Sequence, residues 1–299
     1  MLGMTSHLTS PALTLQAQTI VNGRNTHYAQ HNPTPGLSIK SMSNGHARYE
    51  INDGRFVVSD AVYLVLNQGQ PYTIEIESPT VVESFCLFFP ETWAEDVFCG
   101  LTQPEAALLE SFQNHKQISF FERVYPHDAH ISPLMATLHQ RVKQKSLTEG
   151  FLEEHLRLVL LQLMQVQFNI LRQTETLPAV RASTRVELYR RLSLARDFID
   201  ASLSEPLTLE RIAGVAALSP FHFQRAFKRL FGLSPHAYLT QKRLDRARHL
   251  IETTDTPITD VCLEVGFESL GSFSTLFQRH TGLSPRAYRN AQHSRSFSA

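Results

Sequence analysis

The feature that most constrains this chain is a segment near its C-terminal end that occurs twice. Residues of the first copy recur in the second at a constant offset of 50 residues. Phe223 matches Phe273, Phe227 matches Phe277, Arg229 matches Arg279, and the run 232–235 matches the run 282–285. A solenoid needs at least about three repeats to bury a continuous core, so two copies predict a paired module.

Each copy has the pattern of a short helix, a tight turn and a second helix. Ser219 is followed by proline, which is typical of a helix N-terminus, and Gly232 stands where a helix ends in a left-handed residue. Ser269 and Gly282 mark the same two boundaries in the second copy. A long helix is expected between the copies, over about 234–252. This order predicts two helix-turn-helix units at a fixed separation, able to enter successive major-groove faces about 34 Å apart.

The solvent face of the second helix in each copy carries the candidate DNA-contacting residues. The first copy offers Phe221, Gln224 and Arg225, and glutamine and arginine can pair bidentately with adenine and guanine. The corresponding residues of the second copy are smaller and uncharged, namely Leu270, Gly271, Ser274 and Thr275. Candidates for phosphate contacts are Lys228, Arg229 and Arg279, together with Lys242, Arg243, Arg246 and Arg248 of the connecting helix. We therefore predict that the first copy discriminates bases and that the second mainly positions the domain.

Structural explanations of the same pattern remain open at this stage. The duplicated helices could form a bundle without a nucleic-acid partner, and a run of charges is usually a solvated helix face. Phe221 could be a packing residue rather than a base contact.

Residues from Arg190 on resemble the C-terminal DNA-binding domain of the AraC/XylS family of bacterial transcription regulators. The resemblance is carried by Gly266, Phe267, Phe273, Phe277, the run 282–285 and Tyr288. It implies two helix-turn-helix units on one linker helix that bind promoter DNA, with base contacts from the seven candidate residues named above. Gly271 replaces the longer polar residue usual in the family, and Gln278 replaces its usual lysine, which removes one expected phosphate contact.

Charge is unevenly distributed along a chain whose length predicts two domains. From residue 183 on there are 16 Lys+Arg and 11 Asp+Glu, a net of +5, whereas residues 1–182 carry the remaining 12 and 17, a net of −5. The basic part is the one expected to meet DNA, and its modest excess favours a homodimer. The three cysteines show neither disulfide nor metal spacing, and no leader or long apolar run is evident. We therefore expect a bacterial cytoplasmic protein without a membrane span.

Residues 36–89 change to a two-residue period that predicts a β-barrel or sandwich. A hairpin is expected around 52–54, and a turn at Ser78 and Pro79 is expected to separate two later strands. Residues 1 to about 35 are polar and predict a mobile arm with at most one strand. Such a barrel resembles the cupin-like sensor domain of many of these regulators, which implies a small-molecule effector; a filled core without ligand is the alternative.

Candidate catalytic and metal-binding residues are few. A metal-binding cupin needs clustered histidines and a carboxylate on neighbouring strands, whereas the strand region offers only His46. Nucleophile triads, phosphate loops and redox CxxC motifs are not visible in the sequence. We therefore expect no enzymatic activity, no metal and no cofactor.

The sequence after Pro90 has helical patterns. Helices are expected at 91–98 and 104–112, followed by a longer helix that is apolar over 151–171. That last helix has two apolar faces, so one is expected to pack on its own domain and the other to contact a second subunit. A helix sandwiched inside one subunit is the alternative.

The sequence thus predicts an α+β chain with an N-terminal cupin-like β-barrel followed by helices (1–175), a linker (176–185), and an all-α domain of two helix-turn-helix units joined by a long linker helix (186–299). We interpret it as a sequence-specific DNA-binding transcription regulator. Its expected partners are double-stranded promoter DNA, an unknown small-molecule effector, RNA polymerase and a second copy of itself. The alternative is a cupin-type ligand carrier or enzyme with an accessory helical domain.

Overall fold

The computed structural model describes residues 15–52, 54–102, 118–177 and 181–296. Backbone contacts group the chain into two compact units, residues 1–49 with 58–169 and residues 50–57 with 170–299. The expected linker follows a helix that ends at Thr174, and the next helix begins at Ala182.

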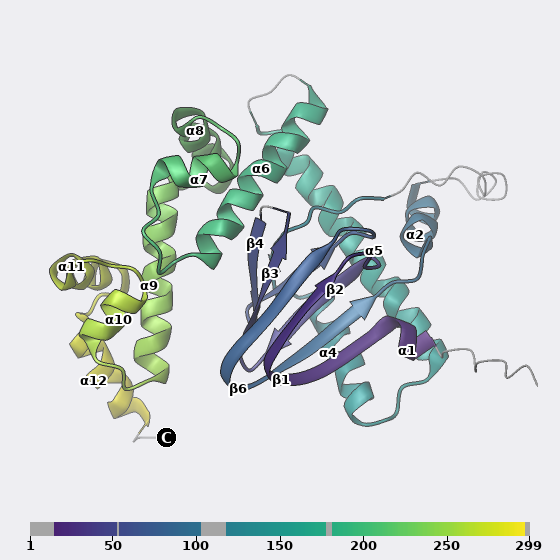
Figure 1. The fold of residues 1–299 in the computed structure, drawn as a ribbon, viewed down its shortest axis with the longest axis horizontal. Helices are drawn as coiled ribbons and strands as arrows, with labels where there is room; N and C mark the ends of the chain where they lie inside the picture. The colour runs from purple at the N-terminus through teal and green to yellow at the C-terminus, as the bar shows by residue number, and fades with distance from the viewer. Residues whose placement is uncertain (1–14, 53, 103–117, 178–180, 297–299) are drawn as a thin grey trace, which may run out of the picture. The chain divides into compact units, whose positions relative to one another are not determined.

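The N-terminal half of the chain is built on a seven-stranded sheet (Figure 1). The strands are β1 (Ile20–Asn32), β2 (Ser38–Ser43), β3 (His46–Ile51), β4 (Gly54–Ser59), β5 (Val62–Leu66), β6 (Tyr72–Phe88) and β7 (Val124–Pro126). Five of them, in the order β6-β2-β5-β4-β3, close into a barrel because β3 pairs back onto β6. Strand β1 adds to β6, and β7 adds to β5. The expected hairpin around residues 52–54 is confirmed as β3 and β4.

Part of the expected mobile arm is a strand, whereas residues 1–14 of the arm lie outside the described residues. Residues 20–32 form β1, which runs antiparallel to β6 from the Ile20–Leu87 pair to the Asn32–Tyr72 pair. Most of its side chains are exposed or half-buried. The sequence of this strand has no apolar alternation, because its backbone is ordered by hydrogen bonding to β6, which lies far away in the sequence.

The turn expected at Ser78 and Pro79 is wrong, since β6 continues from Tyr72 to Phe88. The register of β1 against β6 shifts between Asn25 and His27, where the facing residues of β6 jump from Val82 to Glu77. Pro79 lies in this irregular stretch. Its missing N–H is tolerated there, as is usual for proline at a bulge.

Within the described residues, four further helices belong mainly to the first unit. They are α1 (Leu15–Thr19), α2 (Trp93–Thr102), α4 (Ile131–Lys143) and α5 (Glu149–Thr174). The helix expected at 104–112 lies outside the described residues. One face of α5 is buried through Leu152, Leu156 and Val159, whereas Leu158 keeps 37% of its surface exposed. The second apolar face is therefore only partly covered within this chain.

The C-terminal part of the chain is helical throughout its described residues. Its helices are α6 (Ala182–Ala201), α7 (Leu209–Val215), α8 (Pro220–Phe231), α9 (Pro235–Thr253), α10 (Ile258–Glu264), α11 (Leu270–Thr281) and α12 (Pro285–Ser296). Figure 1 shows α9 running between the α7–α8 pair and the α10–α11 pair. The two helix-turn-helix units and the connecting helix are thus confirmed.

The helix boundaries follow the capping chemistry that the sequence indicates. Ser219 and Ser269 each accept a hydrogen bond from a backbone N–H three residues on, and so begin α8 and α11. Gly232 and Gly282 end the same helices with φ of 78° and 83°. These left-handed values carry almost no steric cost for glycine.

The two copies share one arrangement of packed rings. In the first, Phe227 lies 5.3 Å from Phe223 and 5.7 Å, edge-on, from Tyr238, measured between ring centroids. In the second, Phe277 lies 5.6 Å from both Phe273 and Tyr288, again edge-on to the tyrosine. All four phenylalanines are fully buried. The repeated side chains are therefore the core of each helix-turn-helix unit. In each unit, the tyrosine belongs to the following helix and packs against this core.

The turns of the two helix-turn-helix units differ in length by one residue. The first helices, α7 and α10, begin 49 residues apart, whereas the second helices, α8 and α11, begin 50 apart. The left-handed turn position is Ala217 in the first copy, with φ of 48°, and Gly266 in the second, with φ of 90°. The first turn therefore places an alanine in a left-handed backbone conformation, which is sterically unfavourable for a residue with a Cβ.

The fold class predicted from the sequence is confirmed as a barrel with following helices and then an all-α part with two helix-turn-helix units. Among the described helices, none is long and apolar enough to span a membrane.

Candidate nucleic-acid interface

The polar face of α8 is exposed as the sequence predicts. Phe221 keeps 79% of its surface accessible, and Gln224 and Arg225 are also exposed, while Phe223 and Phe227 on the other face are fully buried. An aromatic side chain this exposed contributes little to the core of its own domain. The packing explanation of Phe221 is thereby weakened.

The corresponding face of α11 presents smaller groups. Leu270, Gly271 and Thr275 are exposed, and Ser274 is half-buried. The hydroxyl of Thr275 donates to the Gly271 carbonyl at 3.0 Å, so its proton is used within the helix. A Cβ at Gly271 would meet only Ser269 Oγ, at 3.8 Å, so packing does not demand glycine there. This helix face thus has room for contacts but few donors of its own.

The three cations expected to contact phosphate lie on the last turns of α8 and α11. Lys228 and Arg279 are exposed. Arg229 is exposed too, but its Nε donates to the carbonyl oxygen of Thr176 at 2.5 Å. Arg229 therefore ties α8 to the segment that precedes α6, a contact that no sequence pattern predicts. Its contact with phosphate stays a prediction, as do those of the other two.

Arg243 of the connecting helix has a structural task. Its guanidinium donates to the Leu203 carbonyl and to the Glu205 carbonyl, each at 2.8 Å, and the side chain is half-buried. It also lies beside Gly266 in the second turn, where an added Cβ would come within 2.8 Å of its Nη2. Arg243 thus joins α9 to the segment after α6 and to the second turn. Arg246 and Arg248 of the same helix are exposed and remain candidates.

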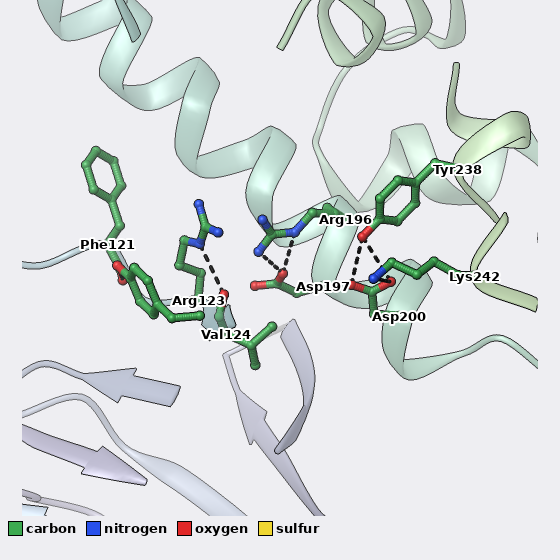
Figure 2. Close-up of polar contacts among 9 residues, drawn as sticks. Phe121, Arg123, Val124, Arg196, Asp197, Asp200, Tyr238 and Lys242 are labelled. Carbon is green, nitrogen blue, oxygen red and sulfur yellow. Dashed lines mark hydrogen bonds and ion pairs between the residues drawn. The ribbon is translucent and has the colours of Figure 1, made fainter. Parts of the chain in front are cut away.

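A polar cluster fixes α9 to α6 (Figure 2). The hydroxyl of Tyr238 donates to both carboxylate oxygens of Asp200, at 3.1 and 2.9 Å, and Lys242 Nζ lies 3.9 Å from the same group. On the same helix Arg196 and Asp197 form an ion pair, with Asp197 only 1% exposed. Burial raises the pKa of Asp200 to about 6. The sequence did not reveal this cluster, because Tyr238 fits an apolar inward row and the acids of α6 look like surface charges.

Possible metal ligands are scattered over the part of the chain that is described. Within those ranges, no three His, Cys, Asp or Glu side chains lie close enough together to hold a metal ion. All three cysteines are free thiols.

Comparisons with known proteins place similarity in the C-terminal part. The profile of a helix-turn-helix domain family matches residues 212–291. The probable transcriptional regulator LumQ of Photobacterium leiognathi is 35% identical over 96 residues, which cover 32% of this chain and 39% of LumQ. The transcriptional activator RhaS of Enterobacter sp. strain 638 is 36% identical over 102 residues, covering 34% of this chain and 37% of RhaS. The chain thus spans about two fifths of the length of these curated relatives.

A solved structure gives a similar match. A transcriptional regulator of Chromobacterium violaceum, described as containing an AraC-type DNA-binding domain, is 31% identical, covers 38% of this chain and 96% of that protein, and superposes with a TM-score of 0.32. The family match over residues 212–291 begins within α7 and ends within α12, so it includes all of α8, α9, α10 and α11. The C-terminal domain of this chain is therefore a helix-turn-helix domain of the AraC family of transcription regulators.

Proposed function

We propose that this protein is a sequence-specific DNA-binding transcription regulator that responds to a small molecule held in its N-terminal barrel. The observation that carries the proposal is the duplicated helix with an exposed polar face, braced on a buried aromatic row. Residues 1–175 act as sensor and dimerisation domain, 176–185 as linker and 186–299 as the DNA-binding domain. We further propose that the chain has no enzymatic activity, because LumQ and RhaS are described as a transcriptional regulator and a transcriptional activator.

The length of the connecting helix supports binding to two neighbouring grooves. Helix α9 has 19 residues, which corresponds to about 28 Å at a rise of about 1.5 Å per residue. Successive major-groove faces on one side of the duplex lie about 34 Å apart. Both helix-turn-helix units pack on α9, so their separation is set before DNA is bound.

The unequal chemistry of α8 and α11 supports a division of labour. Gln224 and Arg225 supply the paired donors and acceptors that adenine and guanine require in the major groove. The face of α11 has no charged side chain apart from its last turn, so Leu270, Gly271, Ser274 and Thr275 would contribute close approach and apolar contact. Lys228, Arg229 and Arg279 would hold the phosphate backbone without regard to sequence.

The remaining partners follow from the same reading of the domain. A homodimer would use the partly covered face of α5 around Leu158, and sedimentation of wild type against Leu158→Glu would test it. Bound to a promoter in a bacterial cytoplasm, such a dimer would contact RNA polymerase. The first unit supports effector binding because its barrel contains a cavity of about 310 Å³.

The test is selection of duplexes from a random library with the full chain, followed by affinity measurements on the selected sequence and its single-base variants. Arg225→Ala should remove preference at one base position, at a cost of about 1–3 kcal/mol. Arg279→Ala should weaken all sequences alike and lower the salt dependence by about one phosphate contact. Equal loss on all sequences from both variants would refute the division of labour. Failure to enrich any sequence would refute the regulator and leave the ligand carrier.

A further inference from the structure

The barrel cavity is walled by strands that are distant in the sequence. Its volume is about 310 Å³, near the lower end of the roughly 300–1,000 Å³ typical of small-molecule sites. Tyr72, Ile74 and Ile76 alternate along β6, so their side chains share one face, and Phe88 lines the cavity further along the same strand. We call these four side chains the apolar wall. Strand β1 contributes polar groups such as Asn25 and Gln30.

Lys40 is buried in this cavity. It is 1% exposed, and its Nζ lies 3.8 Å from the centroid of the Phe88 ring and 4.9 Å from that of Tyr72. Among the residues that the structure describes, no carboxylate and no hydrogen-bond acceptor pairs with this ammonium. Contact with two rings recovers only part of the cost of burying a charge. Burial accordingly lowers the pKa of Lys40 to about 8.

The neighbours of Lys40 cannot supply its missing anion. Cys86 lies opposite it in the register of β2 and β6, and burial raises the pKa of that thiol. Burial also raises the pKa of Tyr49 and of Tyr72 well above the ordinary value. All three groups are therefore neutral at neutral pH, and Lys40 is the one charged side chain among the described residues that line the cavity.

Tyr49 provides a second unsatisfied group. Its side chain from β3 is 1% exposed and lines the same cavity, and its hydroxyl has no hydrogen-bond partner within the described structure. A buried hydroxyl without a partner costs about 1–3 kcal/mol, so such groups are rare unless something else binds them. A hydroxyl donor and an ammonium donor thus line one cavity, and neither has an acceptor.

We propose that the barrel binds a small organic acid whose carboxylate accepts hydrogen bonds from Lys40 Nζ and Tyr49 Oη, while an apolar or aromatic body lies on the apolar wall. A carboxylate carries one negative charge and four lone-pair sites, which match one ammonium and one hydroxyl. A phosphate dianion would keep a charge and several acceptors unpaired here. The proposal names the chemical class of the effector and therefore rests on the proposed function.

The experiment is titration calorimetry on the full chain with four acids, benzoate, phenylacetate, hexanoate and octanoate, each compared with its neutral primary amide. We expect at least one acid to bind at least about tenfold more tightly than its amide, the usual advantage of a charge-assisted hydrogen bond. Lys40→Met should abolish this ratio, and Tyr49→Phe should reduce it roughly fivefold. Lys143→Met removes a half-exposed lysine of α4 by the same substitution and should leave the ratio unchanged.

A second readout needs no variant. Because burial lowers the pKa of Lys40 to about 8, binding of an anion at pH 8 should take up about half a proton, which is measurable in two buffers of different ionisation heat. The amides should take up none. Acids that bind no better than amides, an unchanged ratio in Lys40→Met, or absence of proton uptake would each overturn the proposal. Sequence-selective DNA binding by the same preparation is the control. If DNA binding persists while selectivity for the acids fails, only the proposed effector class is wrong. If the acids bind selectively while no DNA sequence is preferred, only the proposed function as a DNA-binding regulator is wrong.

Discussion

Substitution of Gly266 by alanine should destabilise the C-terminal part of the chain by about 3–5 kcal/mol. Gly266 has φ of 90°, a conformation that costs a residue with a Cβ roughly 1–2 kcal/mol. The new Cβ would also stand 2.5 Å from the Leu203 carbonyl oxygen and 2.8 Å from Nη2 of Arg243. Relief of these clashes requires movement of backbone or loss of the hydrogen bond from Arg243 Nε to Leu203, which adds about 2–3 kcal/mol.

Two spectroscopic signals separate the two units in a urea titration. The chain has a single tryptophan, Trp93 in α2, so its fluorescence reports on the first unit, whereas circular dichroism at the helix minimum is dominated by the helical C-terminal part. In Gly266→Ala the dichroism midpoint should fall while the fluorescence midpoint stays in place. A dichroism midpoint equal to that of wild type would refute the steric argument. An equal fall in both signals would show that the effect is not confined to this turn.

Two further predictions concern the same helical part. Ala217→Gly, at the matching position of the first turn with φ of 48°, should stabilise by about 0.5–1 kcal/mol because the left-handed strain is relieved; a lower dichroism midpoint would contradict this. Asp200 has a folded-state pKa raised from 3.8 to about 6, so the fold prefers its neutral form and loses up to about 3 kcal/mol of stability as pH rises through this window. Asp200→Asn keeps an acceptor for Tyr238 and should remove that pH dependence. The free energy of unfolding of the variant should therefore increase relative to that of wild type from pH 4 to pH 7. A difference that stays constant over this range would show that the pKa of Asp200 is not raised.

The sequence predicted the helical part of the protein in detail because its signals are local. A serine at a helix start bonds to a backbone N–H three residues away, and a glycine at a helix end needs only its own φ, so both boundaries are visible in the chain itself. The buried row of Phe223 and Phe227 is likewise set by helical spacing. Repetition at a constant offset then identified the paired module.

The candidate DNA-contacting residues were found by the same logic, since the face opposite a buried row is exposed. Phe221, Gln224 and Arg225 are exposed as expected. Spacing gave no sign, however, that Arg229 donates to the Thr176 carbonyl or that Arg243 holds the segment after α6. A guanidinium looks the same in a sequence whether its partner is a phosphate or a backbone carbonyl of another segment.

What the sequence alone determined was therefore the order of helices, their ends, their buried faces and the repeat. Only the tertiary structure decided that a polar segment becomes β1, that β6 passes through Pro79 without turning, and that Lys40 and Tyr49 line one cavity. These features depend on hydrogen bonding and burial between strands that are far apart in the chain. Helical signals are complete within a few residues, whereas a strand takes its identity from the partner it pairs with.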